Sequence, residues 1–548
     1  MTRSFPSRLR LLGLSLLLPV LATAQTTPPV SPSPTPAAPA SPQWYLLDAQ
    51  QDGGIMGVSV NRTYKELLQG KASTPVLVAV IDAGIDTAHA DLRRVLWRNP
   101  REVAGNGLDD DKNGYVDDVY GWNFLGGADG RNINEEALEE TRLLARLQPL
   151  YQGKTRTAVP AAKRAEYDLY IKVKKAYEAK VKENNEQLQQ FSQAYAENLQ
   201  GSEGLKQALG VQRLDTATLR NPPTQDAELR QVTKGLYQTL LQTGFASLED
   251  VLAEMKKGVQ ETKDQREYGL NLKFNPRSIV GDQPDNVQQR NYGNRDATGP
   301  DAMHGTHVAG IIGADRENNA GILGVAPNVQ IMSVRAIPDG DERDKDVANA
   351  IRYAVDNGAQ IINMSFGKYF SPQRPAVEEA IRYADKKGVL LVHSAGNENN
   401  NLDQVTQYPS PNFQNGQRIT NLITVGASAR TNDATLAADF SNYGKTQVDV
   451  FAPGNQIYST LPGSKYGNLS GTSMASPVVT GIAATLKSYF PQLTAAQLKR
   501  IILESAQPIH TKVRQPGSSK LVDFADLSRT GGIVNLYRAV QLAQQPMP

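Results

Sequence analysis

Three segments of the chain carry side chains that together could perform nucleophilic acyl transfer. This chemistry needs a hydroxyl nucleophile, a base that takes its proton, a carboxylate that orients the base, and donors for the developing oxyanion. Ser473, in the segment LSGTSMASP, offers the hydroxyl. The segment HGTHVAG offers a base in His304 or His307. The segment VAVIDAGID offers a carboxylate in Asp82 or Asp86, and the residues alone leave both choices open.

Each of these motifs also has an ordinary structural interpretation. A lone Asp at a strand end commonly caps a turn, and a lone Gly-Thr-Ser commonly forms one. A histidine on a helix is more often packed or exposed than used as a base. The joint occurrence of the three motifs in the order Asp, His, Ser is what favours the catalytic interpretation.

Short apolar runs would position these groups. The stretch PVLVAVID at 75–82 is continuous and β-branched, which is typical of a central parallel strand, and Asp82 ends it. Open α/β sheets place functional groups at such strand ends. Ser473 follows Gly471 and precedes an apolar helix, whose N-terminal N–H groups suit an oxyanion. Similar apolar runs recur at 329–334, 360–364, 389–393, 423–426 and 448–451.

Helical patterns separate several of these strands, at 346–357 and 376–387, closed by Gly358 and Gly388. Such alternation predicts an α/β fold whose mostly parallel central sheet carries helices on both faces.

A region rich in Glu, Lys, Gln and Ala interrupts this alternation at 131–290. Its 3-4 apolar spacing predicts a helix over 160–200, about 60 Å long, with Asn184 as a polar break. Shorter helices are predicted near 226–242 and 247–256. We interpret the region as an inserted helical subdomain that is structural, with substrate gating or partner docking as the alternatives. The predicted stripe contains Tyr170, Val173, Tyr177, Val181, Leu188, Phe191, Tyr195 and Leu199.

The first residues resemble an export signal. Arginines precede an apolar run at 11–21, and Ala22-Thr23-Ala24 follows as a cleavage site, so 1–24 is predicted to be a signal peptide. Residues 25–42 alternate Pro with small residues, as a linker does. We therefore expect a secreted or periplasmic protein without a membrane span in the mature chain.

Composition narrows the possible functions further. The chain has 548 residues, a formal charge of +2 and no basic block, so no nucleic-acid partner is expected. The absence of cysteine excludes disulfides and a thiol nucleophile.

Six blocks in one order resemble the subtilase family of serine proteases. They are VAVIDAGID at 78–86, HGTHVAG at 304–310, NMSFG at 363–367, SAGNE at 394–398, VDVFAPG at 448–454 and GTSMASP at 471–477. The resemblance implies a subtilisin-like catalytic domain made of 43–130 and 291–548.

The resemblance also implies roles for individual residues. It selects Asp82 as the orienting carboxylate, His304 as the general base and acid, and Ser473 as the nucleophile. Asn397 and the Ser473 backbone N–H become the oxyanion donors. The implied function is that of a secreted serine endopeptidase, which hydrolyses protein or peptide substrates through an acyl-enzyme intermediate. The alternative is a catalytically silent binding protein of the same fold that uses the insert to hold a partner.

The resemblance further implies a cleft that binds substrate as an extended strand. One wall is Ser365, Phe366 and Gly367, and the other is Ser394, Ala395 and Gly396. Tyr408-Pro409 resembles a family element near the specificity pocket, in which the X-Pro peptide bond can be cis. The alternative is that Pro409 is an ordinary loop proline.

A separate motif has the spacing of a calcium loop. Asp109, Asp111, Asn113, Tyr115 and Asp117 occupy positions 1, 3, 5, 7 and 9, and Gly114 occupies position 6. Position 12 is Tyr120, so the usual bidentate Glu is missing. We expect a structural Ca2+ here, with a solvated acidic turn as the alternative.

Overall fold

The computed structural model describes residues 42–319 and 321–545, which form two compact units. The described parts of the larger unit are 42–139, 275–319 and 321–545, and the smaller unit is 140–274. The predicted signal peptide and all but the last residue of the predicted linker lie outside the described residues.

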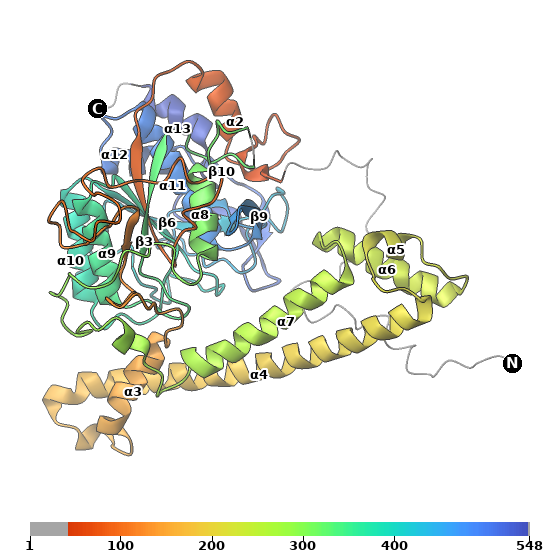
Figure 1. Ribbon diagram of the computed structural model, residues 1–548, viewed down its shortest axis with the longest axis horizontal. Coiled ribbons are helices and arrows are strands. Elements are labelled where there is room, and N and C mark those ends of the chain that lie inside the picture. The colour runs from red at the N-terminus through yellow and green to blue at the C-terminus, as the bar shows by residue number, and fades with distance from the viewer. Residues whose placement is uncertain (1–41, 320, 546–548) are drawn as a thin grey trace. The chain divides into compact units, whose positions relative to one another are not determined.

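The larger unit contains the predicted sheet (Figure 1). Among the described residues it has nine strands in the order β10-β13-β7-β6-β5-β4-β1-β3-β2. Only the β10–β13 pair is antiparallel, so the mostly parallel α/β fold is confirmed. All six predicted apolar runs are strands of this sheet. The bounds are β1 Val76–Asp82, β2 Gly121–Asn123, β3 Val329–Arg335, β4 Ile361–Met364, β5 Leu390–Ser394, β6 Leu422–Ser428, β7 Val450–Pro453, β10 Gln507–Pro508 and β13 Gly532–Ile533.

Helices cover both faces of the sheet, and β1 shows why its sequence is continuously apolar. Val78 and Val80 belong to one buried cluster, and Ala79 and Ile81 belong to the other, because side chains alternate along a strand. The first cluster includes residues of α8 (Met303–Gly313), α11 (Thr472–Tyr489), α12 (Ala495–Glu504) and α13 (Leu536–Ala543). The second includes residues of α9 (Asp344–Asp356) and α10 (Arg374–Lys386), which lie side by side in Figure 1.

Small residues allow α8 to pack closely. A Cβ atom added to Gly305 would collide with the Gly84 carbonyl, and one added to Gly310 would collide with the Thr460 side chain. Thr460 lies in β8 (Ile457–Leu461), which forms a hairpin with β9 (Lys465–Leu469). Gly305 therefore sets how near α8 approaches the end of β1, and Gly310 sets how near it approaches β8. A second hairpin joins β11 (Lys512–Arg514) to β12 (Leu521–Asp523).

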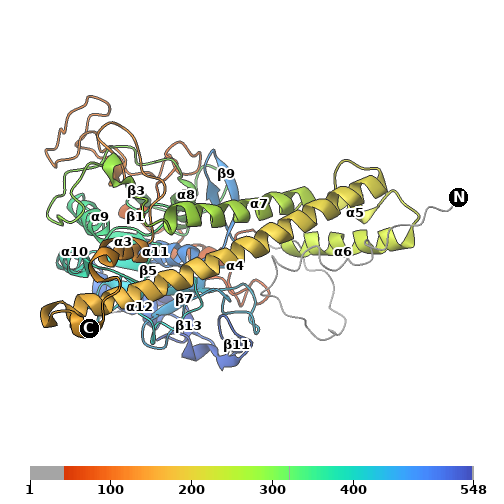
Figure 2. The ribbon, with the colours of Figure 1, turned by 90° about the horizontal axis from the view of Figure 1, so that it is seen from below.

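The smaller unit is helical and has its own buried cluster. Its long helix α4 (Arg164–Leu209) has 46 residues and lies beside α7 (Leu248–Asp264), as Figures 1 and 2 both show. Gly210, with φ +65°, ends α4 nine residues beyond the predicted limit of 200. The remaining helices are α5 (Thr216–Arg220) and α6 (Ala227–Thr243), and α3 (Glu139–Tyr151) begins at the boundary between the units.

The predicted stripe on α4 is correct near its start and wrong at its end. Tyr170 and Val173 are buried, but Leu199 is 39% exposed and Asn198 is buried instead. Asn184 is also buried, and its Nδ2 donates to the Thr262 carbonyl 2.9 Å away. The helix was predictable from spacing, whereas the face it buries depends on its partner helix.

The units divide inside the predicted insert, whose limits were set at 131 and 290. Residues on both flanks are held by the larger unit. The backbone N–H of Glu136 donates to the Asp339 carbonyl at 2.7 Å, and buried Arg277 pairs with Asp346 at 2.7 Å. No helix within 42–319 and 321–545 is long and apolar enough to cross a membrane.

Candidate active site

Asp82 and His304 meet at the carboxyl end of the parallel strands. Asp82 is the last residue of β1, and His304 is the second residue of α8. His304 Nδ1 lies 2.7 Å from Asp82 Oδ1, which also accepts a hydrogen bond from the Ala83 N–H. The Asp82 side chain is 3% exposed, whereas that of His304 is 36% exposed. The carboxylate is thus buried behind an imidazole that reaches the surface.

The environment of His304 favours a charged imidazole. Burial opposes protonation, but the charge and hydrogen bond of Asp82 outweigh it and raise the pKa of His304 above its ordinary value. Asp301 adds to this effect. An imidazole held in this way can accept a proton and keep it while a reaction proceeds.

The competing residues Asp86 and His307 have other contacts. Asp86 accepts hydrogen bonds from the N–H groups of Ala88 and Gly463. His307 is buried, its Nε2 lies 3.2 Å from the Gly467 carbonyl, and burial lowers its pKa to about 4. This geometry favours Asp82 and His304 over both alternatives.

Ser473 is the second residue of α11, at the N-terminus of that helix. Its Oγ donates to the Ser365 carbonyl at 3.1 Å, and Ser365 Oγ donates back to the Ser473 carbonyl at 2.9 Å. In this conformation no hydrogen bond joins Ser473 to His304 within the part of the chain that the structure describes. The structure therefore brings Asp82 and His304 together and holds the Ser473 hydroxyl against Ser365.

Asn397 Nδ2 and the Ser473 backbone nitrogen both lie close to Gly471. A Cβ atom built on Gly471 would lie 3.4 Å from Asn397 Nδ2 and 3.6 Å from the Ser473 nitrogen. The carboxamide is oriented by Thr472, whose N–H and Oγ1 both donate to Asn397 Oδ1, at 2.8 and 2.9 Å. Because the oxygen is engaged in this way, the amide N–H groups remain for a ligand. Thr472 is a site residue that the sequence reasoning missed, although it lies in GTSMASP.

The two predicted cleft walls are mostly buried. Of the first wall, only Gly367 is partly exposed, and Ser365 and Phe366 are buried. Ser394, Ala395 and Gly396 are all buried.

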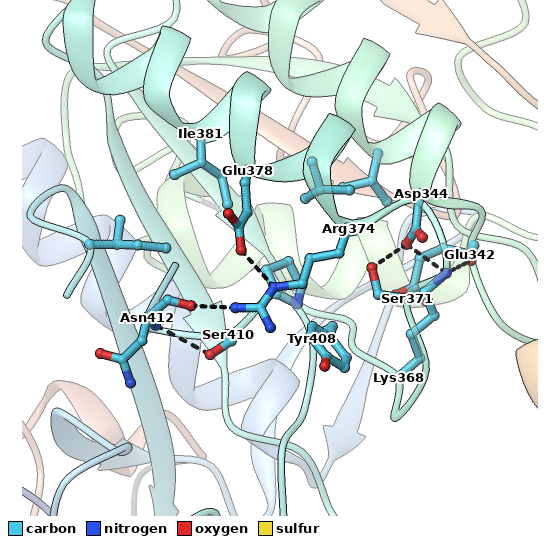
Figure 3. Close-up of a pocket in the computed structure, with 14 residues that line it drawn as sticks. Glu342, Asp344, Lys368, Ser371, Arg374, Glu378, Ile381, Tyr408, Ser410 and Asn412 are labelled. Carbon is cyan, nitrogen blue, oxygen red and sulfur yellow. Dashed lines mark hydrogen bonds and ion pairs between the residues drawn. The ribbon is translucent and has the colours of Figure 1, made fainter. Parts of the chain in front are cut away.

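Behind the first wall, Lys368 and Tyr408 exchange two backbone hydrogen bonds, and the Tyr408-Pro409 peptide is cis. Figure 3 shows a small pocket next to this pairing. Arg374 crosses it, donating to Glu378 at 2.6 Å and to the Asn412 carbonyl at 2.9 Å. The pocket thus contains charged groups that pair with one another.

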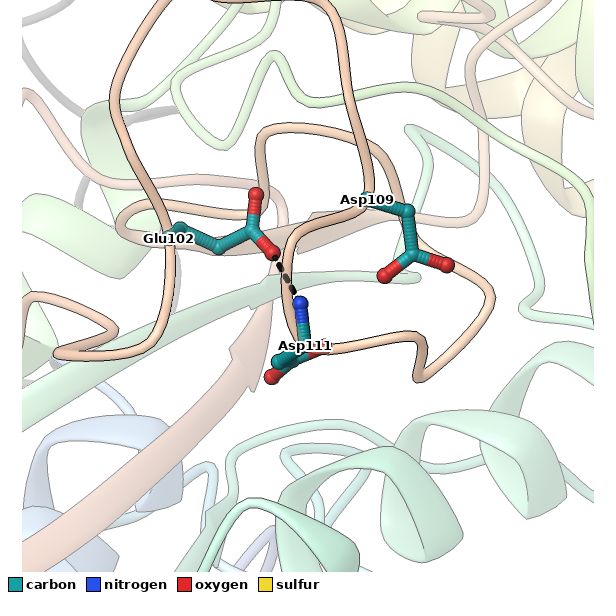
Figure 4. A group of neighbouring side chains, drawn as sticks. All are labelled: Glu102, Asp109 and Asp111. Atoms are coloured by element: carbon teal, nitrogen blue, oxygen red, sulfur yellow. Dashed lines mark hydrogen bonds between the residues drawn. The ribbon is translucent and has the colours of Figure 1, made fainter.

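Two of the five predicted residues of the calcium loop belong to a group of three carboxylates. Carboxylate oxygens of Asp109, Asp111 and Glu102 all lie within 4.8 Å of one another (Figure 4). Glu102 lies before the motif, so the motif spacing could not indicate it. Its Oε2 is buried without a hydrogen-bond partner, which is the state expected of an oxygen that faces a cation.

Of the other three residues of the motif, Asn113 contacts the same carboxylates, because its backbone N–H donates to Asp109 at 3.0 Å and to Asp111 at 3.1 Å. Asp117 accepts from the N–H groups of Gly105 and Gly107 and pairs with Arg295 at 2.5 Å. Asn113 Oδ1 accepts from the Tyr115 N–H, and the Tyr115 ring packs among buried aromatic residues. Asp117 is therefore not part of the carboxylate group around Glu102.

The chain is similar in sequence to known proteases. A thermophilic serine proteinase of Bacillus sp. (strain AK1) is 44% identical over 34% of this chain, which spans 42% of that protein's length. Thermitase of Thermoactinomyces vulgaris is 38% identical over 43% of this chain and 75% of its own. A solved protease structure from Pseudoalteromonas arctica PAMC 21717 is 28% identical, with a TM-score of 0.38, over 47% of this chain and 82% of that one.

The family model of the subtilases matches residues 73–531, from the residues just before β1 to those just before β13. This match includes all the motifs that meet at the carboxyl end of the sheet. The chain belongs to the subtilase family.

Proposed function

We propose that this protein is a serine endopeptidase in which Asp82, His304 and Ser473 form the catalytic triad. The observation that carries the proposal is the 2.7 Å contact between His304 Nδ1 and the buried Asp82 carboxylate, in a chain of the subtilase family. That contact leaves Nε2 of the imidazole available as the base. The relative from Bacillus sp. (strain AK1) is a serine proteinase, which agrees with this activity.

The reaction would begin with a rotation of the Ser473 side chain away from the Ser365 carbonyl and toward His304. Catalytic hydrogen bonds commonly tighten only when substrate binds. His304 Nε2 takes the Oγ proton as Oγ attacks the substrate carbonyl carbon. The resulting oxyanion accepts hydrogen bonds from Asn397 Nδ2 and the Ser473 N–H.

Collapse of this tetrahedral intermediate breaks the peptide C–N bond, and His304 gives its proton to the leaving amine. The ester on Ser473 is then hydrolysed by a water that His304 deprotonates in the same way. Asp82 keeps the imidazole in one tautomer and stabilises its positive charge throughout. Substrates would be protein or peptide chains bound in extended form, with Ser365, Phe366 and Gly367 along one side and Ser394, Ala395 and Gly396 along the other.

We also propose that the loop near Asp109 holds a structural Ca2+. Hard carboxylate oxygens suit this ion, and Glu102, Asp109 and Asp111 supply them. The ion would add nothing to the chemistry on Ser473, and its effect would be on the stability of the loop.

Two further proposals concern the export of the protein and its division into domains. We propose that residues 1–24 direct export, so that the protein acts in the periplasm or outside the cell. We propose that 43–130 and 291–548 form the catalytic domain and that 131–290 is an insertion, of which 140–274 is the helical unit.

Labelling with a serine-directed phosphonate tests the proposed activity. We expect covalent labelling of the wild-type protein, no labelling of Ser473→Ala, and cleavage of a peptide library by the wild type alone. Ser470→Ala is a matched control because this exposed serine lies three residues away and caps the Gln456 N–H. If wild type and Ser473→Ala behave alike, the proposal fails and the catalytically silent binding protein takes its place.

A further inference from the structure

We propose that Asn442 is a positioning residue of the oxyanion site, which holds the loop that carries Asn397. This inference rests on the proposed function. Asn442 lies in the segment FSNYG, about forty residues after Asn397 in sequence, and none of the motifs discussed above includes it. It does not touch the reacting atoms, and it would act only through Asn397.

Asn442 is fully buried and makes five hydrogen bonds to the loop 395–400. Its backbone N–H donates to the Gly396 carbonyl at 2.9 Å. Its side-chain Oδ1 accepts from the N–H groups of Glu398 and Asn400, at 3.2 and 2.7 Å. Its Nδ2 donates to the Ala395 carbonyl and to the Glu398 carboxylate, both at 2.8 Å. These bonds hold the backbone on both sides of Asn397.

Only an amide side chain satisfies this arrangement. Two backbone N–H groups require an acceptor at Oδ1, and a carbonyl with a carboxylate requires a donor at Nδ2. An aspartate would place a second negative charge against Glu398. A Cβ atom on Gly396, whose φ is +97°, would collide with Asn442 Nδ2, so the loop also needs its glycine to approach this close.

A second contact ties the same loop to the opposite wall of the cleft. The Tyr369 hydroxyl donates to Glu398 at 2.7 Å and accepts from Asn400 Nδ2 at 2.8 Å. Tyr369 follows Gly367 by two residues. Burial, together with the Glu398 charge, raises the pKa of Tyr369, so its hydroxyl stays protonated and keeps donating.

The side chain of Asn397 is exposed, and within 42–319 and 321–545 its hydrogen bonds come from Thr472 alone. Its position therefore depends on the backbone that Asn442 fixes. A displacement of about 1 Å in a catalytic group lowers the rate about 100-fold. Loss of the Asn442 side chain should therefore lower kcat while leaving the ground-state binding of substrate nearly unchanged.

The test is a double-mutant cycle between Asn442→Ala and Asn397→Ala in the full chain, read as kcat and KM on one peptide. We expect Asn442→Ala to lower kcat about 10- to 100-fold with KM within about twofold. In the Asn397→Ala background the same substitution should change kcat by less than about threefold, because the group it positions is gone. The matched control is Asn421→Ala, since Asn421 is also buried and donates to the Val389 carbonyl at the other end of β5.

The outcomes separate this inference from the proposed function. If Asn442→Ala keeps full kcat, or loses the same factor in both backgrounds, the positioning role is wrong. If Asn397→Ala itself keeps full kcat, the oxyanion assignment is wrong and the inference falls with it. Should Asn442→Ala not fold, the cycle is run with Tyr369→Phe. We expect a kcat loss of about 3- to 10-fold that disappears in the Asn397→Ala background, and an equal loss in both backgrounds would overturn the proposal.

Discussion

The ion pair between Asp82 and His304 gives the proposed reaction a definite dependence on pH. The base must be neutral to take the Ser473 proton, and Asp82 raises the pKa of the imidazole above about 6.5. We expect kcat/KM to rise with pH through this elevated pKa and then to level off. The interaction of charged His304 with Asp82 also stabilises the folded state, and this effect changes with pH in the opposite direction. It is complete below the pKa of His304 in the unfolded state and is lost as pH rises through the pKa of His304 in the folded state. A pH profile of kcat/KM checks the expected rise in activity.

Two variants serve as controls for that profile. Asp82→Asn should lower kcat about 10,000-fold and move the remaining midpoint to lower pH. His307→Leu should leave the midpoint in place, since His307 is buried and already neutral near pH 7. A midpoint that follows His307 instead of Asp82 would contradict the assignment of the base.

Single residues could be predicted where a short sequence motif contains them. Asp82 and His304 each lie in a short motif, and the geometry agrees with both. The contact of Ser473 with the Ser365 carbonyl could not be predicted, because a side-chain rotation leaves no pattern in sequence. Asn442 is about forty residues from the loop that it holds, and Glu102 lies outside the calcium-loop motif, so no motif spacing indicated either residue.

At the scale of single elements, the loop near Asp109 yields a prediction about stability. At free calcium about 100 times the dissociation constant, binding to the folded state adds about 2.7 kcal/mol. This corresponds to a rise in melting temperature of about 5 °C. We expect chelation to remove that rise, and calorimetry with and without calcium measures it.

Substitutions identify the ligands in that loop. Glu102→Gln, Asp109→Asn and Asp111→Asn should each reduce the calcium-dependent rise, and Asp110→Asn should not. Asp110 is exposed and its carboxylate accepts from the Val103 N–H, outside the group of three. A melting temperature that calcium leaves unchanged would favour the solvated acidic turn.

The long helix α4 shows how far periodicity predicts an element. The 3-4 spacing predicted the helix correctly, but the packing of α7 determined that Asn198 is buried and Leu199 exposed. Asn184, interpreted from sequence as a break in the stripe, is instead a contact, since its Nδ2 also donates to Gln265 at 2.9 Å. Polar residues in a buried stripe are thus poor markers of where a helix interface ends.

Asn184→Ala should weaken the contact between α4 and α7. The Thr262 carbonyl keeps the Gln265 backbone N–H as a donor, so the substitution costs one buried side-chain hydrogen bond, about 0.5 to 1.5 kcal/mol. We expect amides of α7 to exchange with solvent faster by the corresponding factor, whereas Leu199→Ala should have an effect below about 0.5 kcal/mol. Hydrogen exchange in the full chain measures both. Equal protection of α7 in wild type and Asn184→Ala would contradict a stabilising role for this side chain.

For the molecule as a whole, sequence predicted the class of fold better than the limits of its parts. Continuous apolar strands between helical patterns can be buried only in a sheet covered on both faces, and that is the observed arrangement. The boundary positions depended on contacts such as the one between Arg277 and Asp346, which join residues 69 apart. The amino-acid composition changes near 131 and 290, whereas the two compact units divide at 140 and 274.

The separate cores of the two units predict separate unfolding. The buried cluster of the helical unit consists of residues between 194 and 255, whereas the sheet unit has its own two clusters. We therefore expect calorimetry of the full chain to resolve two transitions, measured in Ser473→Ala to prevent self-digestion. Leu240 and Leu486 are buried leucines, one in each unit, and replacing either with Ala costs about 2 to 5 kcal/mol. Leu240→Ala should lower one transition and Leu486→Ala the other. A single transition that both substitutions shift equally would mean that the units unfold together.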